Sequence, residues 1–157
     1  MQILIIHEID WEKKVIFEPH HLAELLSLNG HNVYVIDCQE PNLKNLTNGL
    51  KTNIINNYHR IYSDASITLI RPPSLLIKGL NRLTYFFNCK RIVRETIIKN
   101  KIDVILLYSV ATSGIQTIEI ANELKIPIVF RVLDVAHGFV NYPLIRQVLK
   151  KYEKNII

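Results

Sequence analysis

The sequence contains no long apolar run and has little cysteine. Its two cysteines, Cys38 and Cys89, are too few and too far apart for a disulfide framework or a paired-cysteine metal motif. The apolar start at residues 2–6 meets His7 and Glu8 at once, unlike a signal peptide. No stretch approaches the roughly 20 apolar residues needed to cross a bilayer. We therefore expect a cytoplasmic protein in a reducing compartment, with any membrane contact peripheral and at the inner face.

Glycine is also scarce, at five residues, and no GxGxxG motif precedes Asp37, which ends the second predicted strand. A dinucleotide site is therefore not predicted. The net charge of +5 favours anionic partners weakly, but the basic residues are scattered and no nucleic-acid-binding motif is present, so no nucleic-acid partner is expected. A length of 157 residues with 48% hydrophobic content indicates a single globular domain over residues 1–157.

Several apolar runs lack the polar alternation of a sheet with one wet face. They lie at residues 2–6, 31–37, 102–109 and 126–130. Strands buried on both faces are typical of a parallel sheet covered by helices. The sequence therefore predicts an α/β fold, a Rossmann-like three-layer α/β/α domain with a mainly parallel sheet of six or seven strands.

The remaining segments complete this prediction. Two shorter strands are expected at residues 59–62 and 67–70, and the Asn-rich stretch 41–57 is expected to be mostly loop. Helices are expected at residues 19–29, with Gly30 as a C-terminal cap, and at 75–100, 115–124 and 143–154.

Four passages, taken in order, resemble one family. Residues 27–36 contain a Gly-His-x-Val passage similar to that near the start of GT-B-fold glycosyltransferases. Residues 103–106, then 124–129 followed by Asp134, resemble the second half of the N-terminal domain in the group 1 (family 4) branch. Residues 150–157 are similar to that branch's helix leading into its seventh strand.

This resemblance implies a two-domain, metal-independent and retaining enzyme, in which the first domain binds the acceptor and the second binds a nucleotide-sugar donor. The chain matches only the first domain. Its implied partners are a sugar or lipid-linked acceptor and a C-terminal donor-binding domain that the sequence does not contain. No cofactor is implied apart from the nucleotide-sugar co-substrate, and the fragment alone should not turn over. The alternative is a non-catalytic Rossmann-like or receiver-like binding or regulatory domain.

Ligands of open α/β sheets bind beyond the carboxyl ends of the strands, where this sequence places its polar residues. The predicted catalytic residues are Asp134 and His137, with a helix cap and a surface histidine as the alternative reading. The predicted substrate-binding residues are Glu8, Asp10, Tyr108, Ser109 and Arg131. Arg131 is as well explained by an ion pair with Asp134.

The loop at residues 8–12 departs from the family, because it carries carboxylates where many members have a Gly-Gly turn near the donor phosphates. Leu133 stands where members often have histidine. Glu8 and Asp10 also resemble the acidic pair of phosphoreceiver domains, but Asp64 is a poor match for the phosphoacceptor.

A row of cations spaced by multiples of four lies on the predicted helix at residues 75–100. It consists of Lys78, Arg82, Lys90 and Arg94. This row could rest on an anionic membrane surface, or it could be an ordinary solvated helix face.

Overall fold

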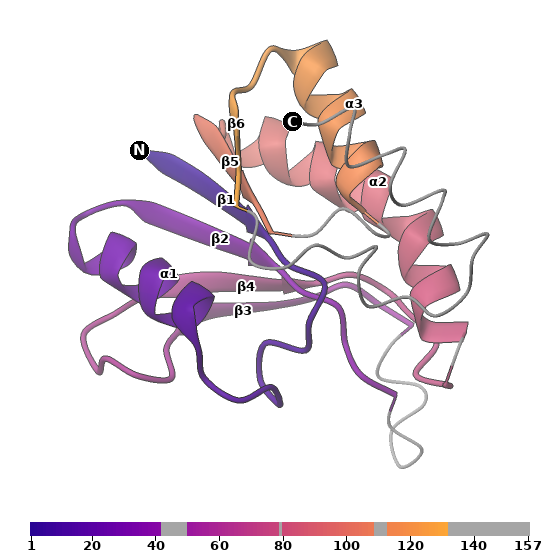
Figure 1. Ribbon diagram of the computed structural model, residues 1–157, viewed down its shortest axis with the longest axis horizontal. Helices are drawn as coiled ribbons and strands as arrows, with labels where there is room; N and C mark the ends of the chain where they lie inside the picture. Colours follow the sequence, from indigo (N-terminus) through magenta and orange to yellow (C-terminus); the bar gives the residue numbers. More distant parts are fainter. Residues whose placement is uncertain (42–49, 79, 109–112, 132–157) are drawn as a thin grey trace.

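The computed structural model describes residues 1–41, 50–78, 80–108 and 113–131. Within them, strands and helices alternate along most of the chain (Figure 1). The strands are β1 (Gln2–Ile6), β2 (Asn32–Ile36), β3 (Asn53–Tyr58), β4 (Ile67–Arg71), β5 (Val104–Leu107) and β6 (Ile128–Phe130). The helices are α1 (Glu18–Leu28), α2 (Leu80–Asn100) and α3 (Gly114–Leu124).

The six strands form one sheet in the order β3-β4-β2-β1-β5-β6. All neighbouring strands are parallel except β3, which pairs antiparallel with β4. In the centre, Ile5 of β1 lies between Val35 of β2 and Leu106 of β5. The predicted α/β/α domain with a mainly parallel sheet is confirmed.

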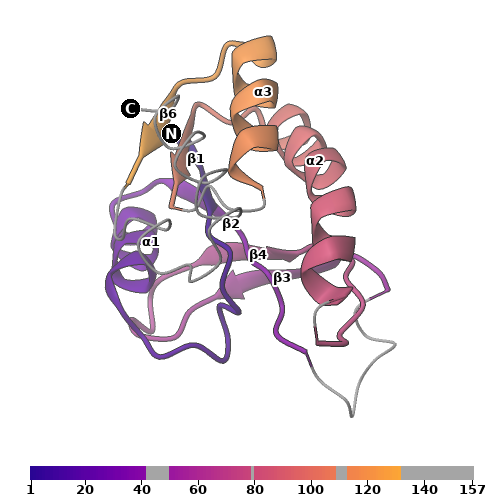
Figure 2. The same cartoon turned by 45° about the vertical axis from the view of Figure 1, so that its right-hand side comes forward.

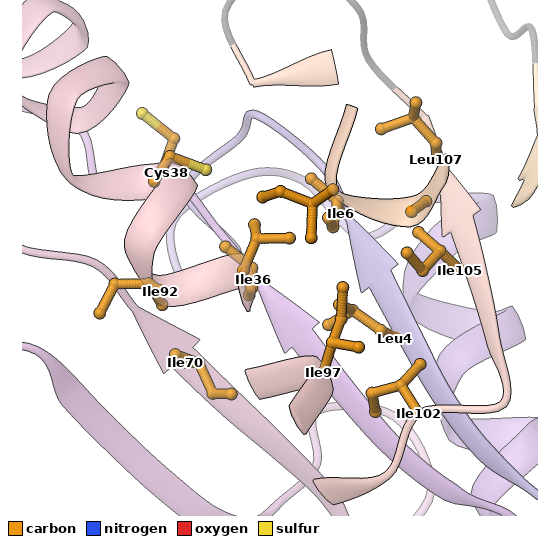
Figure 3. Packing of buried hydrophobic residues seen from close by; sticks show 14 of the residues in the cluster. Leu4, Ile6, Ile36, Cys38, Ile70, Ile92, Ile97, Ile102, Ile105 and Leu107 are labelled. Atoms are coloured by element: carbon orange, nitrogen blue, oxygen red, sulfur yellow. The ribbon is translucent and has the colours of Figure 1, made fainter. Parts of the chain in front are cut away.

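Helices cover both faces of this sheet (Figure 2). Helix α1 lies on one face, and α2 and α3 lie together on the other. Because successive side chains of a strand point to opposite faces, β1 serves both cores. Ile3 and Ile5 join the cluster on the α1 side, whereas Leu4 and Ile6 join the larger cluster beneath α2 and α3 (Figure 3).

Helix α1 ends as the sequence predicts. Gly30 has a φ of +81°, in the left-handed region that glycine adopts without a steric penalty. Its amide donates to Ser27 O (3.0 Å), and the His31 amide donates to Leu26 O (3.2 Å). These two bonds form a Schellman motif, which turns the chain directly into β2.

Three predicted boundaries differ from the structure. Residues 59–62 are not a strand, and the expected loop at 41–57 contains β3 instead. The predicted helix at 75–100 begins only at Leu80. Most of β3 is exposed or half-buried, so its sequence lacks the apolar signal of the inner strands, and pairing with β4 determines its conformation.

The predicted helix at 143–154 lies outside the described residues. Among the helices that the structure describes, none combines the length and hydropathy needed to span a membrane.

Candidate functional site

The polar residues of interest gather at the edge of the sheet formed by the strands' carboxyl ends. Strand β1 leads into α1 on one face, while its neighbour β5 leads into α3 on the other face. This reversal makes the β1/β5 boundary the topological switch point, where open α/β sheets bind their ligands.

A hollow of about 360 Å³ opens at this edge, beyond β1 and β2 and beside the start of α2. Carboxylates and cations line it together: Glu8, Asp10 and Glu40 with Lys14, Lys78 and Arg82. Ile9 and Pro41 add apolar surface. The structure therefore brings the predicted residues Glu8 and Asp10 into one hollow.

Glu8 is fixed by contacts with both helices of the α2/α3 face. The backbone amide of Ser113 donates to Glu8 Oε1 at 2.5 Å, and the Ser113 hydroxyl donates to the same oxygen at 2.9 Å. Arg82 NH1 lies 3.4 Å from Glu8 Oε2. Glu8 is only 6% exposed, so its carboxylate has a defined position at the start of α3.

Asp10 belongs to a buried ionic cluster around Arg71, at the end of β4. Arg71 NH2 lies 2.7 Å from Asp10 Oδ1 and 3.0 Å from Asp37 Oδ2, and NH1 pairs with Glu12. The Glu40 amide donates to Asp10 Oδ2 at 2.9 Å. One guanidinium at the end of β4 thus links the segments that follow β1 and β2.

The two aspartates of this cluster titrate differently. Burial raises the pKa of Asp37 to about 7, although Arg71 opposes the change. Burial would also raise the pKa of Asp10, but the Glu40 amide and Arg71 lower it below its ordinary value. Asp10 therefore stays ionised beside the hollow, while Asp37 is the weaker acid.

His7 points to the other face, into a group of aromatic rings. Its ring centroid lies 5.2 Å from that of Tyr108 and 5.7 Å from that of Phe17. Burial, followed by the charge of His20, lowers the pKa of His7 to about 4, so the ring is neutral near pH 7. Within the described part of the chain, His7 Nδ1 and Trp11 Nε1 are buried without a hydrogen-bond partner.

Tyr108 and Arg131 meet on this α1 side rather than in the hollow. Arg131 NH2 lies 2.9 Å from Glu18 Oε1, and its guanidinium carbon lies 5.7 Å from the Tyr108 ring centroid. The Tyr108 hydroxyl donates to Glu18 at 3.4 Å. The ion pair of Arg131 is therefore made with the start of α1. Its other predicted partner, Asp134, lies outside the described residues, as do Ser109 and His137.

The predicted cationic row is partly engaged by other elements. Lys90 pairs with Glu119 at 2.9 Å, and Arg94 forms two hydrogen bonds with Glu123, so both bind α3. Arg82 faces Glu8, and Lys78 lines the hollow. The outer ridge of α2 instead carries exposed apolar side chains, Leu80, Leu83 and Phe87.

Sequence reasoning missed several residues of this edge, namely Lys14, Arg71 and Glu40, as well as His7 as a buried neutral base. Their common signal is position, because each lies at a strand end or in the segment that follows one.

The acidic pair Glu8 and Asp10 does not form a receiver-type site with Asp64, which lies before β4 at the opposite edge. Among the described residues, no group of three His, Cys, Asp or Glu side chains is arranged to hold a metal ion.

Comparison with known proteins shows likeness of fold but not of sequence family. No family model matches the chain, and no curated protein matches it. The C-terminal domain of a hydrogenase from Pyrococcus furiosus superposes with a TM-score of 0.55 at 17% identity, over 83% of this chain and 90% of that one.

Two larger proteins are also similar. A candidate UDP-N-acetylglucosamine 2-epimerase from Listeria monocytogenes gives a TM-score of 0.53 at 11% identity, over 96% of this chain but 37% of that one. A UGT transferase from Siraitia grosvenorii in complex with UDP gives 0.47 at 14% identity, over 83% of this chain and 27% of that one. The superpositions on the hydrogenase domain and the epimerase show a Rossmann-like fold, and the chain spans about a third of the epimerase structure.

Proposed function

We propose that this chain is the acceptor-binding, N-terminal half of a GT-B-like glycosyltransferase that moves a sugar from a nucleotide-sugar donor. The observation that carries the proposal is the mixed-charge hollow at the carboxyl edge of β1 and β2. The fold and the family-like passages of the sequence support it, while the specific branch, family 4, rests on those passages alone.

The lining of the hollow suits a polyhydroxylated ligand. A sugar hydroxyl both donates and accepts hydrogen bonds, so it can donate to Asp10 or Glu40 and accept from Lys14. The apolar surface of Ile9 and Pro41 suits the C–H face of a sugar ring.

In this proposal the chain orients an acceptor, and a second domain holds the nucleotide sugar. Asp134 and His137 keep the catalytic roles implied by the family resemblance, in a retaining and metal-independent transfer. Tyr108 and Arg131 line the α1 side of the same edge, where Glu18 holds them.

Titration of the labelled chain with simple sugars, such as glucose and N-acetylglucosamine, tests the binding role by NMR. We expect saturable shifts at Asp10, Lys14 and Glu40. Glu40→Gln should weaken the affinity about tenfold, equivalent to about 1.4 kcal/mol, because it removes a charged acceptor. Glu123→Gln is the matched control: this carboxylate lies near the C-terminal end of α3, pairs with Arg94 and does not line the hollow, so the affinity should not change. Shifts scattered over the surface would contradict the proposal.

The catalytic role is tested in the enzyme that contains this chain together with its donor-binding half. Asp134→Asn and His137→Ala should each lower the transfer rate at least about tenfold, corresponding to about 1.4 kcal/mol of transition-state stabilisation. Unchanged rates in both variants would refute these assignments.

A non-catalytic Rossmann-like binding or regulatory domain is the second candidate. It is favoured by the superposition on the hydrogenase domain, which matches this chain in size as well as in fold. A chain that binds no sugar and gains no transfer activity with any donor-binding half would favour it.

We also propose that the outer ridge of α2 contacts an anionic membrane carrying a lipid-linked acceptor. Phe87 is 70% exposed and Leu83 52% exposed. In the sequence, Lys78 precedes this apolar ridge, and Arg91, which pairs with Glu95, follows Phe87 by one helical turn. Apolar side chains bordered by cations are typical of segments that lie in a bilayer interface.

Co-sedimentation with vesicles of phosphatidylcholine and phosphatidylserine tests this contact. Leu83→Ser combined with Phe87→Ser should reduce the bound fraction severalfold, because both side chains would insert. Lys90→Gln combined with Arg94→Gln should have a smaller effect, because those cations already bind α3. Equal binding by wild type and the serine variant would remove the membrane contact.

A further inference from the structure

We infer that Glu8 is a specificity-determining residue, whose carboxylate fills the anion position at the start of α3 and so directs the hollow toward uncharged hydroxyl-bearing groups and away from phosphate. This inference deepens the proposed function and rests on it for the ligand. With Glu8 in this position, we expect this domain to bind the phosphates of a nucleotide-sugar donor poorly.

The position that Glu8 occupies has the chemistry of a phosphate site. An amide at a helix N-terminus, a neighbouring hydroxyl and a guanidinium are the donors that proteins use to bind anions. Here Ser113 supplies the first two and Arg82 the third, and all of them point to the Glu8 carboxylate. α3 is 11 residues long, so its N-terminal dipole adds to the attraction.

The Glu8 carboxylate also influences which ligands can bind in the hollow. Glu8 lines the hollow together with Asp10 and Glu40, and these three carboxylates balance the positive charges of Lys14, Lys78 and Arg82. A hydroxyl group can donate a hydrogen bond to any of them without charge repulsion. With Glu8 ionised, the hollow therefore offers phosphate no net positive charge, and a neutral acceptor is favoured.

Titration with inorganic phosphate, followed by NMR at the Ser113 amide, tests the inference. Wild type should show no saturable shift there. Glu8→Gln removes the charge and Glu8→Ala also opens the space, so both should gain phosphate binding centred on Ser113, at least about tenfold tighter than wild type. Adding Arg82→Gln should weaken the gained binding.

Glu18→Gln is the matched control, because it removes one carboxylate from the α1 side, away from Ser113, and should gain no phosphate binding at Ser113. Wild-type binding of phosphate at Ser113 as strong as that of the variants, or no gain in Glu8→Gln and Glu8→Ala chains with folded spectra, would overturn the inference.

A measurement on the wild type covers the case in which the Glu8 variants fail to fold. The Ser113 amide proton should resonate well downfield, because it donates a short hydrogen bond to the Glu8 carboxylate. A Ser113 amide proton at an ordinary chemical shift overturns the inference without any variant. The phosphate titration and the sugar titration test different statements. If the Glu8 variants gain phosphate binding but the wild type binds no sugar, Glu8 does occupy the anion position at the start of α3, and the acceptor proposal is refuted.

Discussion

At the scale of single residues, the carboxyl edge of the sheet is held together by charge. Arg71 is the shared partner of Asp10, Asp37 and Glu12, which follow two different strands. A buried charge is tolerated only when partners replace its hydration, so each member depends on the others.

Replacing Arg71 by leucine should therefore lower the free energy of unfolding by about 3–5 kcal/mol, because it leaves buried carboxylates unpaired. Chemical denaturation measures the loss. Arg91→Leu, which breaks an exposed pair with Glu95 on α2, is the control and should change stability little. Adding Asp37→Leu to Arg71→Leu should restore part of the loss, and a purely additive double variant would contradict the network.

His7 makes stability depend on pH. Its pKa is lowered from 6.5 in the unfolded chain to about 4 in the folded protein, so the unfolded state binds the proton more tightly. The stability due to the neutral ring is complete above pH 6.5 and decreases as the pH falls toward 4. The complete decrease amounts to about 3 kcal/mol.

His7→Phe keeps an aromatic ring among Phe17 and Tyr108 but cannot be protonated. The variant should therefore gain stability relative to wild type as the pH falls from 6.5 to 4, measured by denaturation across that range. Taking the difference between the two proteins cancels the opposite contribution of Asp37, whose raised pKa favours folding at low pH. Parallel pH profiles would show that His7 is not buried in neutral form.

At the scale of elements, two helices end in the same motif with different residues. Gly30 and Lys125 both have a positive φ, at +81° and +56°. The Ile126 amide donates to Ala121 O at 2.8 Å, as His31 donates to Leu26 in α1. Glycine adopts this conformation freely, whereas lysine carries a steric cost.

Gly30→Ala should therefore destabilise the protein by about 1 kcal/mol, and Lys125→Gly should stabilise it by up to about the same amount. The space around a Cβ at Gly30 is empty, so backbone strain alone is responsible. Thermal unfolding of both variants tests the pair, and a change of the same sign in both would contradict the argument.

Prediction of the elements succeeded where local pattern and tertiary environment agree. Most residues of β1, β2 and β5 are buried or half-buried, and the lack of polar alternation in these runs predicted a parallel sheet covered on both faces. The strand β3 was missed, because Asn56, Asn57 and their neighbours carry no apolar alternation.

At the scale of the whole molecule, the sheet order predicts a gradient of local stability. Strands β1 and β2 are flanked on both sides and covered on both faces, whereas β3 and β6 are at the edges of the described sheet. Amide hydrogen exchange should be slowest in β1 and β2 and fastest in β3. Equal protection in β3 and β1 would refute this order of stability.

The sequence by itself determined the layers of this protein, since runs such as residues 3–6 and 104–107 are apolar at every position and must be buried on both sides. It also determined the turn at Gly30, because that signal is local. Only the tertiary structure decided that Glu8 meets Ser113 and Arg82, and that Arg71 gathers the carboxylates. The partner of a polar side chain depends on which distant segments the fold brings near, and periodicity along the chain does not carry that information.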